Sequence, residues 1–384
     1  MTGQDRFGEN LGLGHEHQKR PLKVLVVDDS AVVREVLTAI LSSQKGITVT
    51  TAADPIIAMA KMDRARPDVI LLDLQMPRMD GLTFLRRIMA EDPIPVVICS
   101  SQAETGTEAA LRALEEGAVD IISKPKIGVK DFLRESSLVL IDAVWGAARA
   151  RLSPKTVSSS SSLVPPPAIR GPIQNLRAGF SRRSIIAIGA STGGTEALRL
   201  LLEAMPKDAP GIVIVQHMPQ GFTAAFARRL NELCVIHVKE AAEGDLITNG
   251  KAFIAAGNRH LLVRRSGADL LVEVTDGPLV TRHRPSVDVL FRSVARVAGP
   301  NAIGVILTGM GSDGASGLLE MKQAGAATIA QDESTSVVFG MPKESISKGA
   351  VDEVVALPDI PSAILRRVSP ATGPLKMKDP GFRI

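Results

Sequence analysis

Short apolar runs alternate with helical patterns in two separate blocks of this chain, and this alternation restricts its fold more than any other feature. The runs of the first block are Val24–Val27, Val69–Leu72, Val96–Cys99 and Val119–Ile122. Those of the second block are Ile185–Ile188, Ile212–Val215 and Ile303–Leu307. Apolar strands that alternate with helices are typical of parallel sheets covered by helices on both faces. The sequence therefore predicts an α/β fold with two doubly wound parallel sheets.

A change of composition separates the two blocks. Residues 143–182 contain Ser158–Ser162, Pro165–Pro167 and several arginines. No acidic residue lies between Ala150 and Arg183. Such a segment cannot bury a core, and we interpret it as a flexible basic linker, solvated or docked on an acidic partner. We predict a disordered head over 1–20, a first domain over 21–142, a second domain over 183–368 and a disordered tail over 369–384.

Composition argues against several classes of protein. The net charge of +4 comes from 45 basic and 41 acidic residues without a continuous basic face, which disfavours nucleic-acid binding. No apolar run approaches the roughly 18 residues of a membrane span, and no secretory signal opens the chain. The two cysteines, Cys99 and Cys234, suggest no disulfide framework. We expect a cytoplasmic protein that is not inserted in a membrane.

Carboxylates follow two strands of the first block. Asp28 and Asp29 come directly after the first run, and Asp73 comes directly after the second. At the carboxyl edge of a parallel sheet they would repel one another unless a hard cation such as Mg²⁺ neutralised them. Ser100 and Lys124 end the next two runs. This set predicts a phosphoryl-accepting site with Asp73 as the nucleophile.

The first block resembles the receiver domains of two-component response regulators. The matching segments are Val26–Ser30, Leu71–Gly81, Ser100 and Lys124–Pro125. The resemblance implies a flavodoxin-like fold in which Asp73 takes phosphate from a histidine kinase. It also implies that Asp28, Asp29, Asp73 and the backbone carbonyl of Gln75 hold Mg²⁺, while Ser100 and Lys124 act as switch residues. Ile121 departs from the aromatic residue that many receivers carry near this position, which leaves the relay of the signal open.

A G-x-S-x-G pattern at Gly189–Gly193 opens the second block. It follows an apolar run and precedes a helical pattern, so Ser191 would stand at a helix N-terminus, where backbone N–H groups can stabilise an oxyanion. A phosphate-binding turn or a plain glycine-rich loop is the alternative. The G-x-G-x-x-G spacing and a following P-loop lysine are both missing, which argues against a nucleotide loop.

A base and an acid follow two further strands of this block. His217 comes just after Ile212–Val215, and Asp313 lies in the loop after Ile303–Leu307. Both would reach the sheet edge of Ser191, in an order that differs from Ser-Asp-His of α/β-hydrolases. Asp288 is the alternative acid. We expect structural roles for His237 and His260. For His283, a solvated loop and a place in the cleft stay equally open.

The second block resembles the protein-glutamate methylesterases of bacterial chemotaxis. The matching segments are Ile188–Thr195, Gln216–Pro219, His283–Asp288 and Thr308–Gly314. The resemblance implies a Rossmann-like domain with an added β-hairpin, which the turn signals between Cys234 and Val274 also suggest. It implies a Ser191–His217–Asp313 triad with oxyanion-hole amides from Thr192 and Met310. Ala256 replaces a proline common in relatives, in a turn away from this triad.

This resemblance also implies an activity. The enzyme would hydrolyse glutamate methyl esters on methyl-accepting chemotaxis receptors, release methanol and deamidate receptor glutamines, with no cofactor in the catalytic domain. The two-domain order suggests that the unphosphorylated receiver covers the Ser191 cleft and that phosphorylation loosens the contact. The alternative is a non-catalytic response regulator whose second domain binds a partner or DNA.

Overall fold

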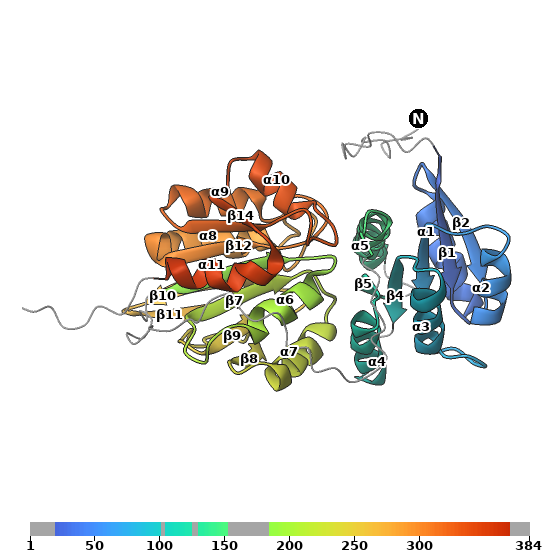
Figure 1. Ribbon diagram of the computed structural model, residues 1–384, viewed down its shortest axis with the longest axis horizontal. Coiled ribbons are helices and arrows are strands. Elements are labelled where there is room, and N and C mark those ends of the chain that lie inside the picture. Colours follow the sequence, from blue (N-terminus) through green and yellow to red (C-terminus); the bar gives the residue numbers. More distant parts are fainter. Residues whose placement is uncertain (1–19, 101–103, 125–129, 153–183, 369–384) are drawn as a thin grey trace, which may run out of the picture.

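The computed structural model describes residues 20–100, 104–124, 130–152 and 184–368, and these form two α/β domains (Figure 1). Residues 1–19, residues 369–384 and most of the predicted linker lie outside the described residues. The prediction of two doubly wound parallel sheets is confirmed. In the described part of the chain, no helix is long and apolar enough to cross a membrane.

The first domain is a parallel sheet of order β2-β1-β3-β4-β5 with helices on both faces. Its strands are β1 (Leu22–Val27), β2 (Ile47–Ala52), β3 (Val69–Leu72), β4 (Val96–Ser100) and β5 (Asp120–Ser123). Its helices are α1 (Ala31–Ser42), α2 (Pro55–Met62), α3 (Gly81–Glu91), α4 (Glu104–Glu115) and α5 (Lys130–Ala148). Strand β2 was not predicted from the sequence, because this edge strand alternates threonines with half-buried apolar residues instead of forming an apolar run.

The boundary predicted at residue 142 is wrong, because α5 continues to Ala148. Ala143, Val144 and Ala147 are buried in the same cluster as the strand residues Val97 and Cys99. Small apolar residues at helical spacing thus keep the last turns of α5 on the sheet. The first domain therefore extends further along the chain than predicted.

The second domain has a seven-stranded parallel sheet of order β14-β13-β12-β6-β7-β9-β8. Its strands are β6 (Ile185–Ala190), β7 (Gly211–Gln216), β8 (His237–Glu240), β9 (Lys251–Ile254), β12 (Ala302–Ile306), β13 (Ala327–Gln331) and β14 (Glu353–Val355). Its helices are α6 (Gly194–Glu203), α7 (Phe222–Leu233), α8 (Val287–Ala298), α9 (Ala315–Gln323), α10 (Met341–Ser347) and α11 (Ile360–Arg367). Short 3₁₀ turns cover Gly299–Asn301 and Leu357–Asp359.

The added hairpin consists of β10 (His260–Ser266) and β11 (Asp269–Thr275), which pair antiparallel. The expectation of hairpins extended back to Cys234, and there it is wrong, because β8 and β9 pair in parallel within the main sheet. The turn-forming residues between them belong to a longer connection. Strands β13 and β14 were also not predicted from the sequence.

The sheet register brings the ends of three central strands of the second domain to one level. Ala190 of β6 pairs with Gln216 of β7, and Gly189 pairs with Ile306 of β12. Gly189 is required for this packing, since a Cβ atom there would lie 2.2 Å from Cγ1 of Val287. The loops after β6, β7 and β12 therefore leave the sheet beside one another.

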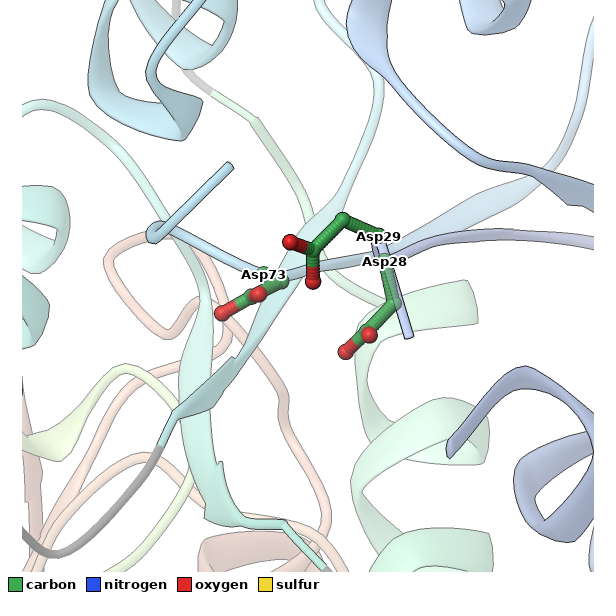
Figure 2. A group of neighbouring side chains, drawn as sticks. All are labelled: Asp28, Asp29 and Asp73. Carbon is green, nitrogen blue, oxygen red and sulfur yellow. The ribbon is translucent and has the colours of Figure 1, made fainter. Parts of the chain in front are cut away.

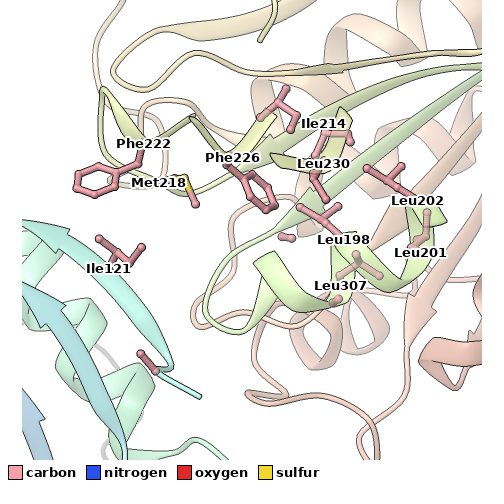
Figure 3. Packing of buried hydrophobic residues seen from close by; sticks show 14 of the residues in the cluster. Ile121, Leu198, Leu201, Leu202, Ile214, Met218, Phe222, Phe226, Leu230 and Leu307 are labelled. Atoms are coloured by element: carbon pink, nitrogen blue, oxygen red, sulfur yellow. The ribbon is translucent and has the colours of Figure 1, made fainter. Parts of the chain in front are cut away.

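The first domain packs on the second through the side that carries α4, β5 and α5 (Figure 1). Helix α4 contacts both α6 and α7. Ile121 of β5 belongs to the same continuous cluster of buried side chains as Met218 and Phe222 of the second domain, and it faces them in Figure 3. The position expected to carry an aromatic switch residue thus contributes an aliphatic side chain to the domain interface.

Candidate active site and phosphorylation site

Ser191 stands in a tight turn between β6 and α6. Its backbone N–H donates to Thr308 at 3.0 Å, and Gly194 donates back to the Ser191 carbonyl at 2.7 Å. Gly193 has a φ of +75°, a left-handed conformation that favours glycine. A Cβ atom on Gly309 would come within 2.7 Å of the Ser191 Cβ atom. The turn therefore has a fixed shape and leaves the serine only 9% exposed.

His217 follows β7 on the neighbouring turn. Its backbone N–H donates to Ala190 at 3.1 Å. The buried Gln216 amide donates to the carbonyls of Ser191 at 2.9 Å and His217 at 3.1 Å. This side chain holds the serine turn against the histidine turn, a role that the sequence motif did not reveal. Its signal was an amide at a buried strand end, where an apolar residue would be usual.

Asp313 completes the group from the loop after β12. Its Oδ2 atom lies 2.9 Å from Nε2 of His217, and the residue is fully buried. It also accepts hydrogen bonds from the Ser286 hydroxyl at 2.8 Å and the Val287 amide at 2.7 Å. Burial alone would raise the pKa of this carboxyl, but the His217 and Ser286 hydrogen bonds outweigh it and lower the pKa. Asp313 is therefore held as a carboxylate.

The second ring nitrogen of His217 is available for chemistry. Its Nδ1 atom is buried and has no hydrogen-bond partner among the described residues. Ser191 and His217 line the same cavity, and no hydrogen bond joins their side chains in this structure. With Nε2 bound to Asp313, Nδ1 is the nitrogen that can take a proton from the serine.

Two backbone N–H groups face the same region. Within the described part of the chain, the amides of Thr192 and Met310 donate to no acceptor, and both residues are buried at the cavity wall. The Thr308 hydroxyl donates to the Thr192 carbonyl at 3.0 Å and fixes that peptide. Free N–H groups beside a serine are suited to binding an oxyanion.

Of the other described histidines, only His283 lies against His217. His237 is exposed on β8, whereas His260 is buried and hydrogen-bonded to Pro278 and Ser286. His283 stacks on His217 with ring centroids 3.8 Å apart and planes 9° from parallel. Burial, and secondarily the neighbouring His217, lowers its pKa to about 3. His283 therefore lies in the cleft as a neutral ring. His15 and His17 lie outside the described residues.

Asp288 does not serve as the acid beside His217. Its Oδ1 atom accepts hydrogen bonds from the amides of Gly314 at 3.1 Å and Gly317 at 2.7 Å, at the start of α9. It therefore caps a helix, while Asp313 faces the histidine.

The carboxylates expected at the edge of the first sheet do come together. Carboxylate oxygens of Asp28, Asp29 and Asp73 all lie within 4.8 Å of one another (Figure 2). The Lys124 ammonium lies 2.9 Å from Asp28 and 2.8 Å from Asp73. Clustered carboxylates fit a hard divalent cation, and the ammonium compensates part of their charge.

Asp73 is buried at the centre of this site. Burial raises the pKa of its carboxyl, although the hydrogen bond from Lys124 opposes that effect. The Gln75 backbone N–H donates to it at 3.3 Å. Ser100 is buried at the end of β4, where it pairs in register with Ser123 of β5, one residue before Lys124. These residues surround a carboxylate that a bound cation would keep ionised.

The first domain covers the serine turn. The Thr192 hydroxyl donates to Asp120 of β5 at 2.9 Å, and the Gly193 amide donates to the Val119 carbonyl at 3.3 Å. A cavity of about 990 Å³ remains between the domains. Its walls include Ser191, Thr192, His217, His283 and Met310 of the second domain and Asp120 and Asp142 of the first. Asp120 was not predicted as part of this site from the sequence.

Comparisons with known proteins agree with this two-part architecture. A sequence model of the family described as CheB methylesterase matches residues 186–364, and one described as response regulator receiver domain matches residues 24–132. A protein-glutamate methylesterase/protein-glutamine glutaminase of Anaeromyxobacter dehalogenans is 60% identical over 351 residues, which are 90% of this chain and 97% of the relative. The chain belongs to this methylesterase family.

Another named relative matches over a similar length, and a solved structure matches the second domain. A protein of the same name from Geobacter metallireducens is 55% identical over 90% of this chain and 99% of its own length. The crystal structure of the Thermotoga maritima CheB methylesterase catalytic domain has 38% identity and a TM-score of 0.47, covering 48% of this chain and 98% of that chain.

Proposed function

We propose that this protein hydrolyses glutamate methyl esters on methyl-accepting chemotaxis receptors, releasing methanol, and deamidates receptor glutamines to glutamate. The observation that carries the proposal is the buried Asp313–His217 pair beside Ser191, on the ends of adjacent strands. Family membership supports the substrate class, since relatives of this length are named for both activities.

The chemistry starts with proton transfer from Ser191 to Nδ1 of His217. The serine oxygen attacks the γ-carbonyl carbon of the ester or amide. Asp313 fixes the ring through Nε2 and stabilises the imidazolium that forms. His217 then gives its proton to the leaving methanol or ammonia. Water, deprotonated by the same ring, hydrolyses the acyl-enzyme and releases Ser191.

The Thr192 and Met310 amides support the tetrahedral intermediate. Their N–H groups are free of protein acceptors in the described structure and lie at the wall that carries Ser191. Charge on the substrate oxygen develops only in the transition state, so these donors stabilise it more than the ground state. Loss of one such donor typically lowers turnover by about 10²–10³.

The first domain would control this reaction through phosphorylation of Asp73 by a histidine kinase. Asp28, Asp29, Asp73 and the backbone carbonyl of Gln75 would hold Mg²⁺, which would neutralise charge on the incoming phosphoryl group. Lys124 and Ser100 would respond to that group. Lys124 directly follows β5, and Asp120 at the other end of β5 contacts Thr192, so a shift of the strand would reach the serine turn.

Regulation follows from this contact. With the receiver docked, Asp120 and the Val119 carbonyl occupy donors of the serine turn and hinder a receptor helix from reaching it. Phosphorylation would loosen the contact. If Asp73→Asn left stimulation by a small phosphodonor unchanged, this mechanism would be wrong.

Methanol release from methylated chemoreceptor membranes tests the proposed function. The native protein should release methanol faster with a phosphodonor and Mg²⁺, and Ser191→Ala should release none under either condition. Thr195→Ala, a change beside the same turn, is a matched control for folding. Absence of release from folded native protein, with Ser191 still labelled by an acylating probe, would indicate a different ester. Absence of both would favour a partner-binding domain.

A further inference from the structure

A strained two-residue turn lies beside the catalytic histidine. Val280 and His283 exchange backbone hydrogen bonds of 3.1 and 2.9 Å, which leaves Thr281 and Arg282 at the tip. Both tip residues have positive φ, +49° and +67°, as in a type I′ turn that usually carries Asn-Gly. Neither a β-branched residue nor an arginine favours this conformation, and such strain is found mostly at functional sites.

The surrounding contacts hold this turn in place. His283 stacks on His217, and the Thr281 hydroxyl donates to the buried Asp288 at 3.3 Å. Arg282 lies between these two anchored residues, Thr281 and His283, so its backbone position is fixed next to the ring that stacks on His217. Its side chain lines the cavity that contains Ser191 and is 34% exposed.

Arg282 pairs with an acid of the first domain. Its ion pair crosses the interface, to Asp142 of α5 at 3.5 Å. Among the described residues, Arg282 has no acidic partner in the second domain. Removal of the receiver would leave this guanidinium free in the cleft.

Two carboxylates of the described part of the receiver thus line the catalytic cleft. Asp120 accepts from the Thr192 hydroxyl, and Asp142 faces Arg282. Burial raises the pKa of Asp142, and Arg282 only partly offsets this effect. The Asp142 carboxylate is therefore weakly stabilised beside Arg282, and a carboxylate of an acidic ligand that binds Arg282 more favourably can displace it.

We propose that Arg282 is a specificity-determining residue that binds an acidic side chain of the substrate, close to the glutamyl group that reacts at Ser191. This inference rests on the proposed function and deepens it, because it assigns an acidic substrate segment to one cation of the cleft. Asp142 of the docked receiver occupies the same guanidinium. Substrate and receiver therefore compete for Arg282, and release of the receiver frees the binding group and the serine turn together.

The test uses the full chain carrying Asp142→Asn, which removes the competing carboxylate and leaves every residue of the second domain unchanged. Ser191 is labelled with a neutral fluorophosphonate in the presence of an oligoglutamate or an oligoglutamine peptide. The concentration of peptide that halves the labelling rate of Ser191 is measured for each variant, relative to the labelling rate of the same variant without peptide. Anisotropy of a fluorescent oligoglutamate gives the same affinities without requiring a reactive serine.

Oligoglutamate should protect Ser191 more strongly than oligoglutamine, and Arg282→Ala should weaken protection and binding about tenfold, which corresponds to ~1.4 kcal/mol. Arg282→Lys should keep part of the affinity, because a point charge replaces the planar fork. Arg259→Ala, a surface arginine paired with Asp276 outside the cavity, is the matched control and should match the parent.

Equal protection in Arg282→Ala and its parent would overturn the proposal, as would absence of oligoglutamate binding in the parent. Either result would leave Arg282 as a contact of the receiver only. A parent that binds oligoglutamate but releases no methanol from receptor membranes would instead contradict the proposed activity. The two failures are therefore distinguishable.

Discussion

Asp313 and Asp288 cap each other's helices: Asp313 caps α8, which contains Asp288, and Asp288 caps α9, which follows Asp313. Asp313, which precedes α9, accepts hydrogen bonds from the Val287 and Asp288 amides at the start of α8. Asp288, in the first turn of α8, accepts from the Gly314 and Gly317 amides at the start of α9. Only Asp313 also meets His217. This exchange fixes the Asp313 carboxylate through two helix N-termini, whose dipoles favour a negative charge.

The exchange separates the roles of the two acids. Asp313→Asn should lower methanol release by about 10³–10⁴, because the ring of His217 loses its orienting carboxylate. Asp288→Asn should reduce stability by about 1–2 kcal/mol with a much smaller loss of rate, because it weakens only a cap. Urea denaturation and receptor demethylation measure the two effects. A greater loss of rate in Asp288→Asn would show that the acid has been assigned wrongly.

His283 should make stability depend on pH. Its folded pKa of about 3 lies below the ordinary value of 6.5, since burial disfavours the charged ring. The unfolded chain therefore binds a proton that the folded chain does not, and stability falls as pH drops from about 6.5 toward 3. His283→Phe should reduce the loss of unfolding free energy between pH 7 and pH 5 by about 1–2 kcal/mol.

The same position tests ring stacking in catalysis. His283→Phe keeps a flat ring against His217 and should retain most activity, whereas His283→Ala should lower kcat by removing that support. Steady-state kinetics over a range of pH distinguishes the two variants. Equal kcat values for His283→Phe and His283→Ala would show that ring stacking does not position His217.

Gly146 of α5 provides a way to separate the domains. A Cβ atom there would lie 3.0 Å from the Thr192 hydroxyl and 3.6 Å from Met310. Gly146→Leu should prevent docking and raise methanol release by the unphosphorylated protein several-fold, with a smaller further increase on phosphorylation. Gly146→Ala is the matched control, because it improves helix propensity by about 1 kcal/mol with a much smaller wedge. Unchanged basal release in Gly146→Leu would contradict inhibition by this interface.

Asp120 should make domain docking sensitive to pH. Burial raises its pKa from 3.8 to about 6 in the docked form, with smaller opposing effects from its hydrogen bonds. Docking therefore takes up a proton, is favoured below pH 4 and weakens as pH rises through the window from 4 to 6. Energy transfer between dyes on the two domains should decrease across that window. Asp120→Asn should abolish the change and hold the domains together more strongly at pH 7.

Residue patterns alone determined the two parallel sheets and the strand ends at which Ser191, His217, Asp313 and the receiver carboxylates stand. Apolar runs identify buried strands, and parallel strands bring the residues at their carboxyl ends to one edge of the sheet. These patterns could not reveal β2, whose alternating burial resembles an exposed segment, or the true end of α5, which contacts with the sheet sustain.

The tertiary structure decided which polar groups meet and which nitrogen of His217 remains free. The sequence favours Asp313 as the acid and leaves Asp288 as the alternative, and only the packing of α8 against α9 shows that Asp313 meets the histidine while Asp288 caps a helix. Asp120 meets Thr192, and Asp142 meets Arg282, only because the two domains approach each other. Contacts between side chains far apart in sequence depend on packing geometry, which no local pattern encodes.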